Sequence, residues 1–87
     1  MTLPERVMLL NLERDELEAR LRAVSEKTYI KWAEQRIARW KTSGAQANLV
    51  LHSRGAGYAE SEQIVTVALQ QDVDELTKLL ATMEAQR

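Results

Sequence analysis

The sequence predicts an all-α protein: a helical hairpin or small helical bundle in which a long N-terminal helical arm packs on a C-terminal helix, within an oligomer. Apolar residues recur at spacings of three and four along most of the chain, which is the period of an amphipathic helix. The residues that break helices are few, since the only proline is Pro4 and the glycines are Gly44, Gly55 and Gly57. The 87 residues contain no cysteine, so a single domain over 1–87 has neither disulfides nor a zinc-thiolate site, and association is the remaining support for a small core.

The first helix is expected to begin at the N-terminus. Thr2 and Glu5 have the spacing of a capping box, and Pro4 falls in the first turn, where its missing N–H costs nothing. Arg14 interrupts an apolar stripe that consists of Leu3, Val7, Leu10, Leu17, Leu21 and Val24. A second apolar face lies opposite and consists of Met8, Leu12, Ala19 and Ala23. One subunit of this size can hardly cover both faces. We therefore expect an interface between copies at Val7, Leu10, Leu17 and Leu21.

The sequence leaves open whether this arm is one helix or two. After residue 28 the apolar positions move to another side of the helix, where they are Tyr29, Ala33, Ile37 and Trp40. Ser25 or Thr28 could cap a new helix, which would put a break near residues 25–28. The alternative is one unbroken helix over residues 3–42 that packs on different elements along its two halves. No glycine or proline stands at the junction, which favours the unbroken helix.

Gly44 is predicted to end the arm, because glycine readily takes the left-handed conformation that follows a helix. A short helix over 45–54, a loop over 54–58 and a last helix over 59–85 are expected to follow. The last helix has the most regular stripe in the chain, made of Val65, Leu69, Val73, Leu76, Leu80 and Met83. Within it, Leu69 and Leu76 are the residues that we expect at the interface between copies.

Residues 27–41 form a basic and aromatic segment with five Lys or Arg residues, one glutamate and both tryptophans. Trp32 lies off the apolar stripe and close to Arg36 and Arg39, which is the residue composition of an interface hot spot. These three residues are therefore the predicted partner-binding site. Two alternatives stay open: the same residues could stack bases and hold phosphates, or Trp32 could simply cover a junction of two helices with Arg36 stacked on it.

The loop before the last helix is a weaker candidate site. Arg54, Gly55 and Gly57 precede a helix N-terminus, where converging N–H groups can hold an anion. The third glycine of a dinucleotide-binding motif is missing, however, and there is no lysine of the Walker type.

No catalytic residues, cofactor or metal site are predicted. The only histidine is His52, and its neighbour Ser53 cannot face it on a helix. Asp72 and Glu75 lie at helical spacing and are interpreted as part of a solvated face.

The charges of the two halves are opposite. Residues 1–43 carry nine Lys or Arg and seven Asp or Glu, whereas residues 44–87 carry three and six, so the halves should attract each other. The expected function is a non-enzymatic helical protein–protein interaction module, such as an adaptor, co-chaperone, antitoxin or inhibitor, that self-associates and binds a protein partner. The alternative is a small helical protein that binds nucleic acid or a nucleotide through residues 27–41 and 54–57. The chain has no signal peptide and no run of about 20 apolar residues, which predicts a cytoplasmic protein without a membrane partner.

Overall fold

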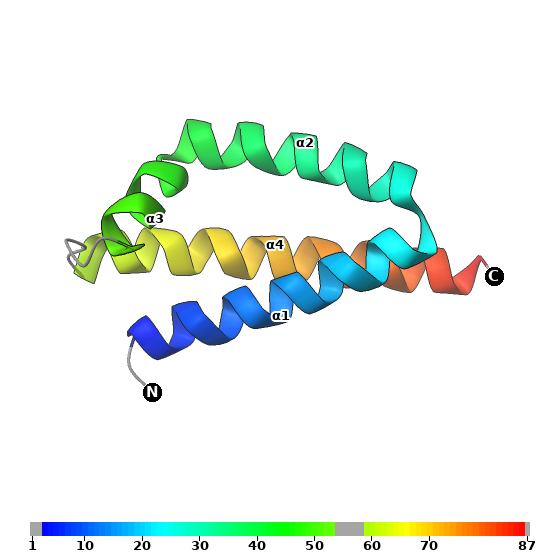
Figure 1. Cartoon of the computed structure of the whole chain (residues 1–87), viewed down its shortest axis with the longest axis horizontal. Coiled ribbons are helices and arrows are strands. Elements are labelled where there is room, and N and C mark those ends of the chain that lie inside the picture. Colours follow the sequence, from blue (N-terminus) through cyan, green and yellow to red (C-terminus); the bar gives the residue numbers. More distant parts are fainter. Residues whose placement is uncertain (1–2, 54–58, 87) are drawn as a thin grey trace.

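The computed structural model describes the backbone of residues 3–53 and 59–86. These residues form four α-helices and no strand, which confirms the all-α prediction: α1 (Leu3–Val24), α2 (Glu26–Ser43), α3 (Ala45–Ser53) and α4 (Ala59–Ala85). α1 and α4 run side by side in the same direction, and α2 returns in the opposite direction, with side-chain hydrogen bonds to α4 (Figure 1). α3 crosses from the end of α2 to the beginning of α4 (Figure 1). No helix in this part of the chain is long and apolar enough to cross a membrane.

The N-terminal arm is two helices, so the favoured prediction of an unbroken helix over 3–42 was wrong. The break lies at Ser25, whose backbone is extended with φ −157° and ψ 99°. The Ser25 hydroxyl accepts a hydrogen bond from the backbone N–H of Thr28 at 3.2 Å, which is the geometry of an N-cap. The Ser25 backbone also donates to the carbonyl of Leu21 and accepts from the N–H of Tyr29. The chain therefore reverses direction with few unpaired backbone groups, and α2 can fold back along α4.

The predicted helix end at Gly44 is confirmed. Gly44 has φ 78° and donates its N–H to the carbonyl of Lys41 at 3.3 Å. α3 then begins at once, and the side-chain amide of Asn48 donates to the carbonyl of Gly44 at 2.9 Å. The predicted helices over 45–54 and 59–85 correspond to α3 and α4.

The core lies along α4, which α1, α2 and α3 surround. It has two clusters, and the partly buried Leu17 packs against both of them. The buried residues of the first cluster are Val7, Leu10, Trp40, Ala45, Val65, Ala68, Leu69 and Val73. Those of the second are Leu21, Trp32, Leu76 and Leu80. The regular stripe of α4 is therefore the centre of the fold.

These clusters contain every residue that the sequence placed at an interface between copies. Val7, Leu10 and Leu21 of α1 are buried, as are Leu69 and Leu76 of α4. The partner of the α1 stripe is the α4 stripe of the same chain. The burial of these residues thus requires no second copy, and an interface between copies has to use other side chains.

Candidate functional site

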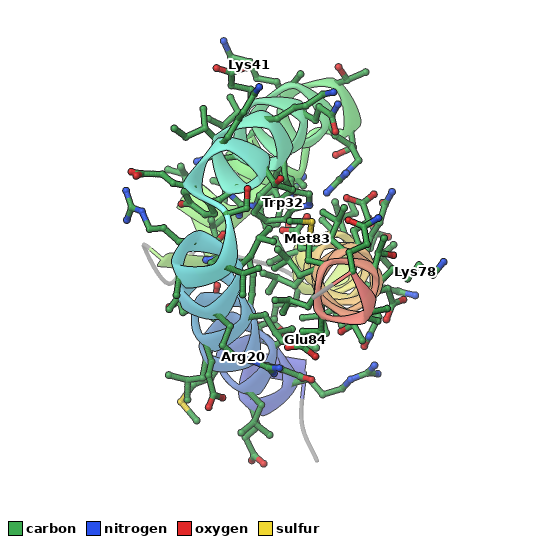
Figure 2. The ribbon with its side chains drawn as sticks, turned by 90° about the vertical axis from the view of Figure 1, so that its right-hand side faces the viewer. Arg20, Trp32, Lys41, Lys78, Met83 and Glu84 are labelled. Atoms are coloured by element: carbon green, nitrogen blue, oxygen red, sulfur yellow. The ribbon has the colours of Figure 1, made fainter. Side chains whose placement is uncertain are left out.

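The basic and aromatic segment faces the interior. Trp32 is only 3% exposed and Trp40 only 1%. The prediction that Trp32 is an exposed partner-binding residue was therefore wrong. The helix turns both tryptophans toward α4 and leaves Ile30 and Ile37 outside, at 48% and 59% exposure. Figure 2 shows Trp32 in the space between the helices.

Two carboxylates of α4 pair with the two arginines of this segment, and we call Arg36, Arg39, Asp72 and Glu75 the ionic layer. Asp72 is fully buried and accepts a hydrogen bond from Arg36 Nε at 2.7 Å and another from Arg39 Nη2. Arg39 Nη1 donates to both carboxylate oxygens of Glu75 at 2.8 and 2.7 Å. The interpretation of Asp72 and Glu75 as a solvated face was thus wrong. These pairs join the two halves of the chain, as their opposite charges predicted.

The tryptophan N–H groups complete this arrangement. Trp40 Nε1 donates to the two oxygens of Asp72 at 3.2 and 3.0 Å, and Trp32 Nε1 donates to Glu75 Oε2 at 3.1 Å. The Arg36 guanidinium lies 4.3 Å from the centre of the Trp40 ring, so the expected cation–π contact is present but involves Trp40 and not Trp32. Hydrogen bonds and ion pairs between side chains therefore hold α2 against α4. Two of the cations that a nucleic acid would need are already paired with carboxylates.

α1 also places charged side chains in the interior, those of Arg14 and Glu18. Arg14, which interrupts the apolar stripe, is mostly buried, and its Nε lies 3.7 Å from Glu18 Oε1. Two nitrogens of Arg14, Nε and Nη1, have no hydrogen-bond partner among the described residues. Burial raises the pKa of Glu18, while the charges of Arg14 and Arg36 lower it by less. The carboxylate of Glu18 is therefore less stable inside the folded protein than in water.

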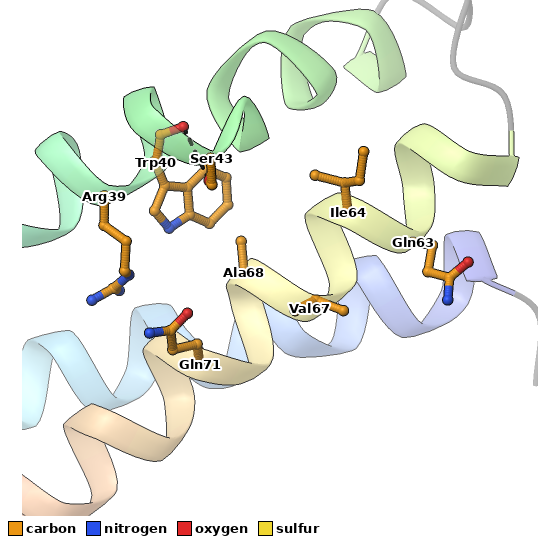
Figure 3. A pocket seen from close by; sticks show the side chains of 8 residues that line it. All are labelled: Arg39, Trp40, Ser43, Gln63, Ile64, Val67, Ala68 and Gln71. Atoms are coloured by element: carbon orange, nitrogen blue, oxygen red, sulfur yellow. Dashed lines mark hydrogen bonds between the residues drawn. The ribbon is translucent and has the colours of Figure 1, made fainter.

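A hollow of about 340 Å³ lies between α2 and α4, beside the ionic layer (Figure 3). Its apolar lining includes the buried Trp40 and Ala68, together with the exposed Ile64 and Val67. Arg39 also lines it, but its guanidinium is held by the carboxylates of α4. Such a hollow can accept an apolar side chain. None of the residues that line it is a nucleophile beside a general base.

One predicted site, in the loop before α4, lies outside the part of the chain that the structure describes. Arg54, Gly55 and Gly57 lie outside the described residues, as does the side chain of His52. Among the described residues, no group of three or more His, Cys, Asp or Glu side chains could hold a metal ion.

Apolar side chains are also exposed outside this hollow, and on α1 and α2 several of them lie on one side of the helix. On α1 the predicted second face is uncovered, and we call its residues the α1 outer face: Met8, Leu12, Ala19 and Ala23. On α2 the exposed side carries Ile30 and Ile37 together with three exposed lysines, and we call it the α2 outer face: Lys27, Ile30, Lys31, Ile37 and Lys41. The apolar spacing does not predict the α2 outer face, because Ile37 continues the stripe that contains Tyr29, Ala33 and Trp40.

Comparison with protein-family models, curated proteins and solved structures finds no match to this chain, and its function has to be argued from its own residues.

Proposed function

We propose that this chain is a non-enzymatic protein–protein interaction module that self-associates and binds a partner protein through its outer apolar faces. The observation that carries the proposal is the exposure of large apolar side chains on all four helices. Met8 and Leu12 of α1 are 57% and 60% exposed, Ile37 of α2 is 59% exposed, and Val67 of α4 is 62% exposed. Met8 and Leu12 lie about one turn apart on the same side of α1, and apolar side chains grouped in this way are typical of an interaction site.

The distribution of charge supports the same conclusion. The chain places a fully buried carboxylate and two partly buried arginines between its helices, while apolar side chains stay outside. Covering one of these half-exposed side chains would contribute roughly 1 kcal/mol from the apolar area removed from water. Association through several of them would therefore add considerably to the stability of a small fold.

The proposed partner is a protein, because two of the five cations of residues 27–41 are paired with carboxylates and neither tryptophan is exposed. Arg36 and Arg39 bind Asp72 and Glu75, and both tryptophan rings are buried, so no exposed ring remains on α2 to stack on a base. The surface that remains accessible on α2 combines isoleucines with lysines.

Native mass spectrometry of the gently purified full chain tests the proposal, because one spectrum reports the number of subunits and any retained ligand. We expect species with the mass of two or more chains, and no species that carries a small-molecule adduct. A parallel pull-down would compare the unaltered chain with a variant that carries Met8→Gln and Leu12→Gln, with Thr82→Gln as an exposed control. A monomer at all concentrations that captures no protein, or a nucleotide adduct, would contradict the proposal.

A further inference from the structure

We propose that two copies of this chain form a dimer by exchanging α1, so that α1 of each copy packs on α4 of the other and continues into its own α2 as one unbroken helix. This inference rests on the self-association in the proposed function and places it in a contact that the fold already contains. While α1 packs on α4 of its own chain, an interface between copies has to use other side chains. After the exchange, the same buried side chains form the interface.

The connection between α1 and α2 is a single residue. α1 ends at Val24 and α2 begins at Glu26, so Ser25 alone makes the reversal. Its backbone is extended, with φ −157° and ψ 99°, and a change of these two angles to helical values would join the two helices. Exchange of an identical element between copies needs only such a hinge, because the other contacts form again in the dimer.

The hydrogen bonds at Ser25 already resemble those of a helix. Its N–H donates to the carbonyl of Leu21 at 2.8 Å, and its carbonyl accepts from the N–H of Tyr29 at 3.0 Å. Both bonds join residues four apart, as in an α-helix. Straightening would give the N–H of Thr28 the carbonyl of Val24 in place of the Ser25 hydroxyl. The unbroken helix therefore replaces a side-chain cap by a backbone hydrogen bond.

The residues around the junction favour a helix. Arg22, Ala23, Glu26 and Lys27 flank it, and all four residue types have high helix propensity. Neither glycine nor proline occurs between Pro4 and Gly44. Within one copy, the contacts between α2 and α4 override this local preference. In the exchanged dimer, the unbroken helix and those contacts form together.

The contacts divide the chain into an arm, α1, and a body of α2, α3 and α4. The ionic layer and the tryptophan N–H groups hold α2 against α4 within the body. The arm packs on α4 through its apolar stripe, and the ion pair of Arg20 with Glu84 at 3.1 Å is exposed. These contacts form equally well with the arm of a second copy. α1 is therefore the part of the chain that can be exchanged.

The directions of the helices allow the dimer to close. α1 and α4 run in the same direction, and α2 runs in the opposite one (Figure 1). If α1 continues the line of α2 beyond one body, it has the direction of α4 in a second body that is related to the first by a two-fold axis. Each copy gives one arm and receives one, so the assembly ends at two copies. The exchange does not use the α1 and α2 outer faces.

Two substitutions at the hinge should move the equilibrium in opposite directions. Ser25→Ala removes the cap that the reversal needs and favours the unbroken helix. Glu26→Pro does the reverse, because proline is tolerated at the first position of a helix but not in a helix interior. Proline also favours an extended residue before it, as Ser25 is here. Glu26→Ala is the matched control, since it removes the same carboxylate without restricting the backbone.

Sedimentation velocity on full chains refolded from urea at several concentrations would report the masses, and circular dichroism would check that each variant keeps its helical content. We expect the unaltered chain and Glu26→Ala to show a dimer that increases with concentration. Ser25→Ala should raise the association constant by about tenfold or more. Glu26→Pro should lower it by about a hundredfold or more, because both unbroken helices of the dimer would contain a proline.

A distance within one copy distinguishes the exchange from any other dimer. The chain has no cysteine, so spin labels can be attached at Arg6→Cys and Lys41→Cys, which are exposed positions near the start of α1 and the end of α2. In one unbroken helix, a rise of 1.5 Å per residue places them about 52 Å apart. In the reversed arm, the start of α1 and the end of α2 lie at the same end of the molecule, whose shorter dimensions are 27 and 16 Å (Figure 1).

Electron paramagnetic resonance would measure this distance in labelled chain refolded with an excess of unlabelled chain. We expect the long distance in the dimer and the short one when the labels are placed in Glu26→Pro. A dimer that keeps the short distance, or Glu26→Pro that dimerises as well as Glu26→Ala, would overturn the exchange and leave self-association standing. If neither the unaltered chain nor Ser25→Ala formed a dimer, both the exchange and the self-association of the proposed function would be rejected.

Discussion

Replacing Asp72 by asparagine would test whether a buried carboxylate holds α2 on α4. The substitution keeps the shape of the side chain but removes its charge. Arg36, Arg39 and Trp40 all donate to this carboxylate, and Asp72 has no exposed surface. The amide would present one oxygen to these donors and would turn its NH2 group toward a cation. Two arginines would then be left partly buried with one carboxylate, that of Glu75.

The expected loss is large in comparison with the stability of the fold. Removing one partner of a buried ion pair costs about 3–5 kcal/mol. A chain of 87 residues has a free energy of unfolding of about 4–13 kcal/mol, at roughly 0.05–0.15 kcal/mol per residue. Urea unfolding followed by circular dichroism at 222 nm would measure the loss. With a slope near 1 kcal/mol per molar urea, we expect the midpoint to fall by about 3 M or more.

Asp74→Asn is the matched control on the same helix. Asp74 is exposed and, among the described residues, accepts a single hydrogen bond, from Gln70 at 3.1 Å, so its substitution should change the free energy of unfolding by less than about 0.5 kcal/mol. If Asp72→Asn were as harmless as Asp74→Asn, the ionic layer would not fasten α2, and the reasoning would be refuted.

Three further substitutions test single features of the fold. Ser25→Ala removes the N-cap of α2 and should lower the free energy of unfolding by about 1 kcal/mol; no change in urea unfolding would argue against the observed helix break. Gly44→Ala forces a side chain into the left-handed region and should cost about 1 kcal/mol, although the added carbon would have space, since its nearest neighbour is Asn48 Nδ2 at 3.8 Å. An unchanged melting temperature would contradict this. Burial raises the pKa of Glu18, so its ionised form costs stability at neutral pH, and this cost disappears as the pH falls through the raised pKa. Glu18→Gln should therefore unfold at higher urea than the unaltered chain at pH 7, with a smaller difference at pH 4; a difference that grows toward low pH would contradict the burial of Glu18.

Periodicity and helix-end signals predicted most of the fold. The stripe from Val65 to Leu80 defines the buried side of α4, and Gly44 ends α2 where its conformational freedom suggested. Ser25 is a possible cap in the sequence, but the absence of glycine and proline at the junction favours an unbroken helix. The break is favoured by tertiary contacts, because a reversal at Ser25 lets the arginines of α2 reach the carboxylates of α4. The local sequence around residue 25 does not show these contacts.

The error over Trp32 has a related cause. A search for apolar stripes assumes that charged residues lie outside, whereas Arg36 and Arg39 occupy inward positions on α2. The sequence does contain a signal for this arrangement. Arg36 and Arg39 are three residues apart on one helix, and Asp72 and Glu75 are three residues apart on the helix antiparallel to it, so the two pairs can meet. With those pairs considered, Ile37 would have been assigned to the outside.

Acrylamide quenching of the tryptophan fluorescence of the full-length chain tests most directly whether the tryptophans of α2 face inward and leave the isoleucines outside. Trp32 and Trp40 are the only tryptophans, so the emission reports on these two positions alone. Because both are at most 3% exposed, we predict that all of the native emission is shielded, and that quenching rises sharply only when the chain is unfolded in urea. If about half of the native emission were quenched as readily as in the unfolded chain, one tryptophan would lie on the surface, and the inward-facing arrangement of α2 would be contradicted.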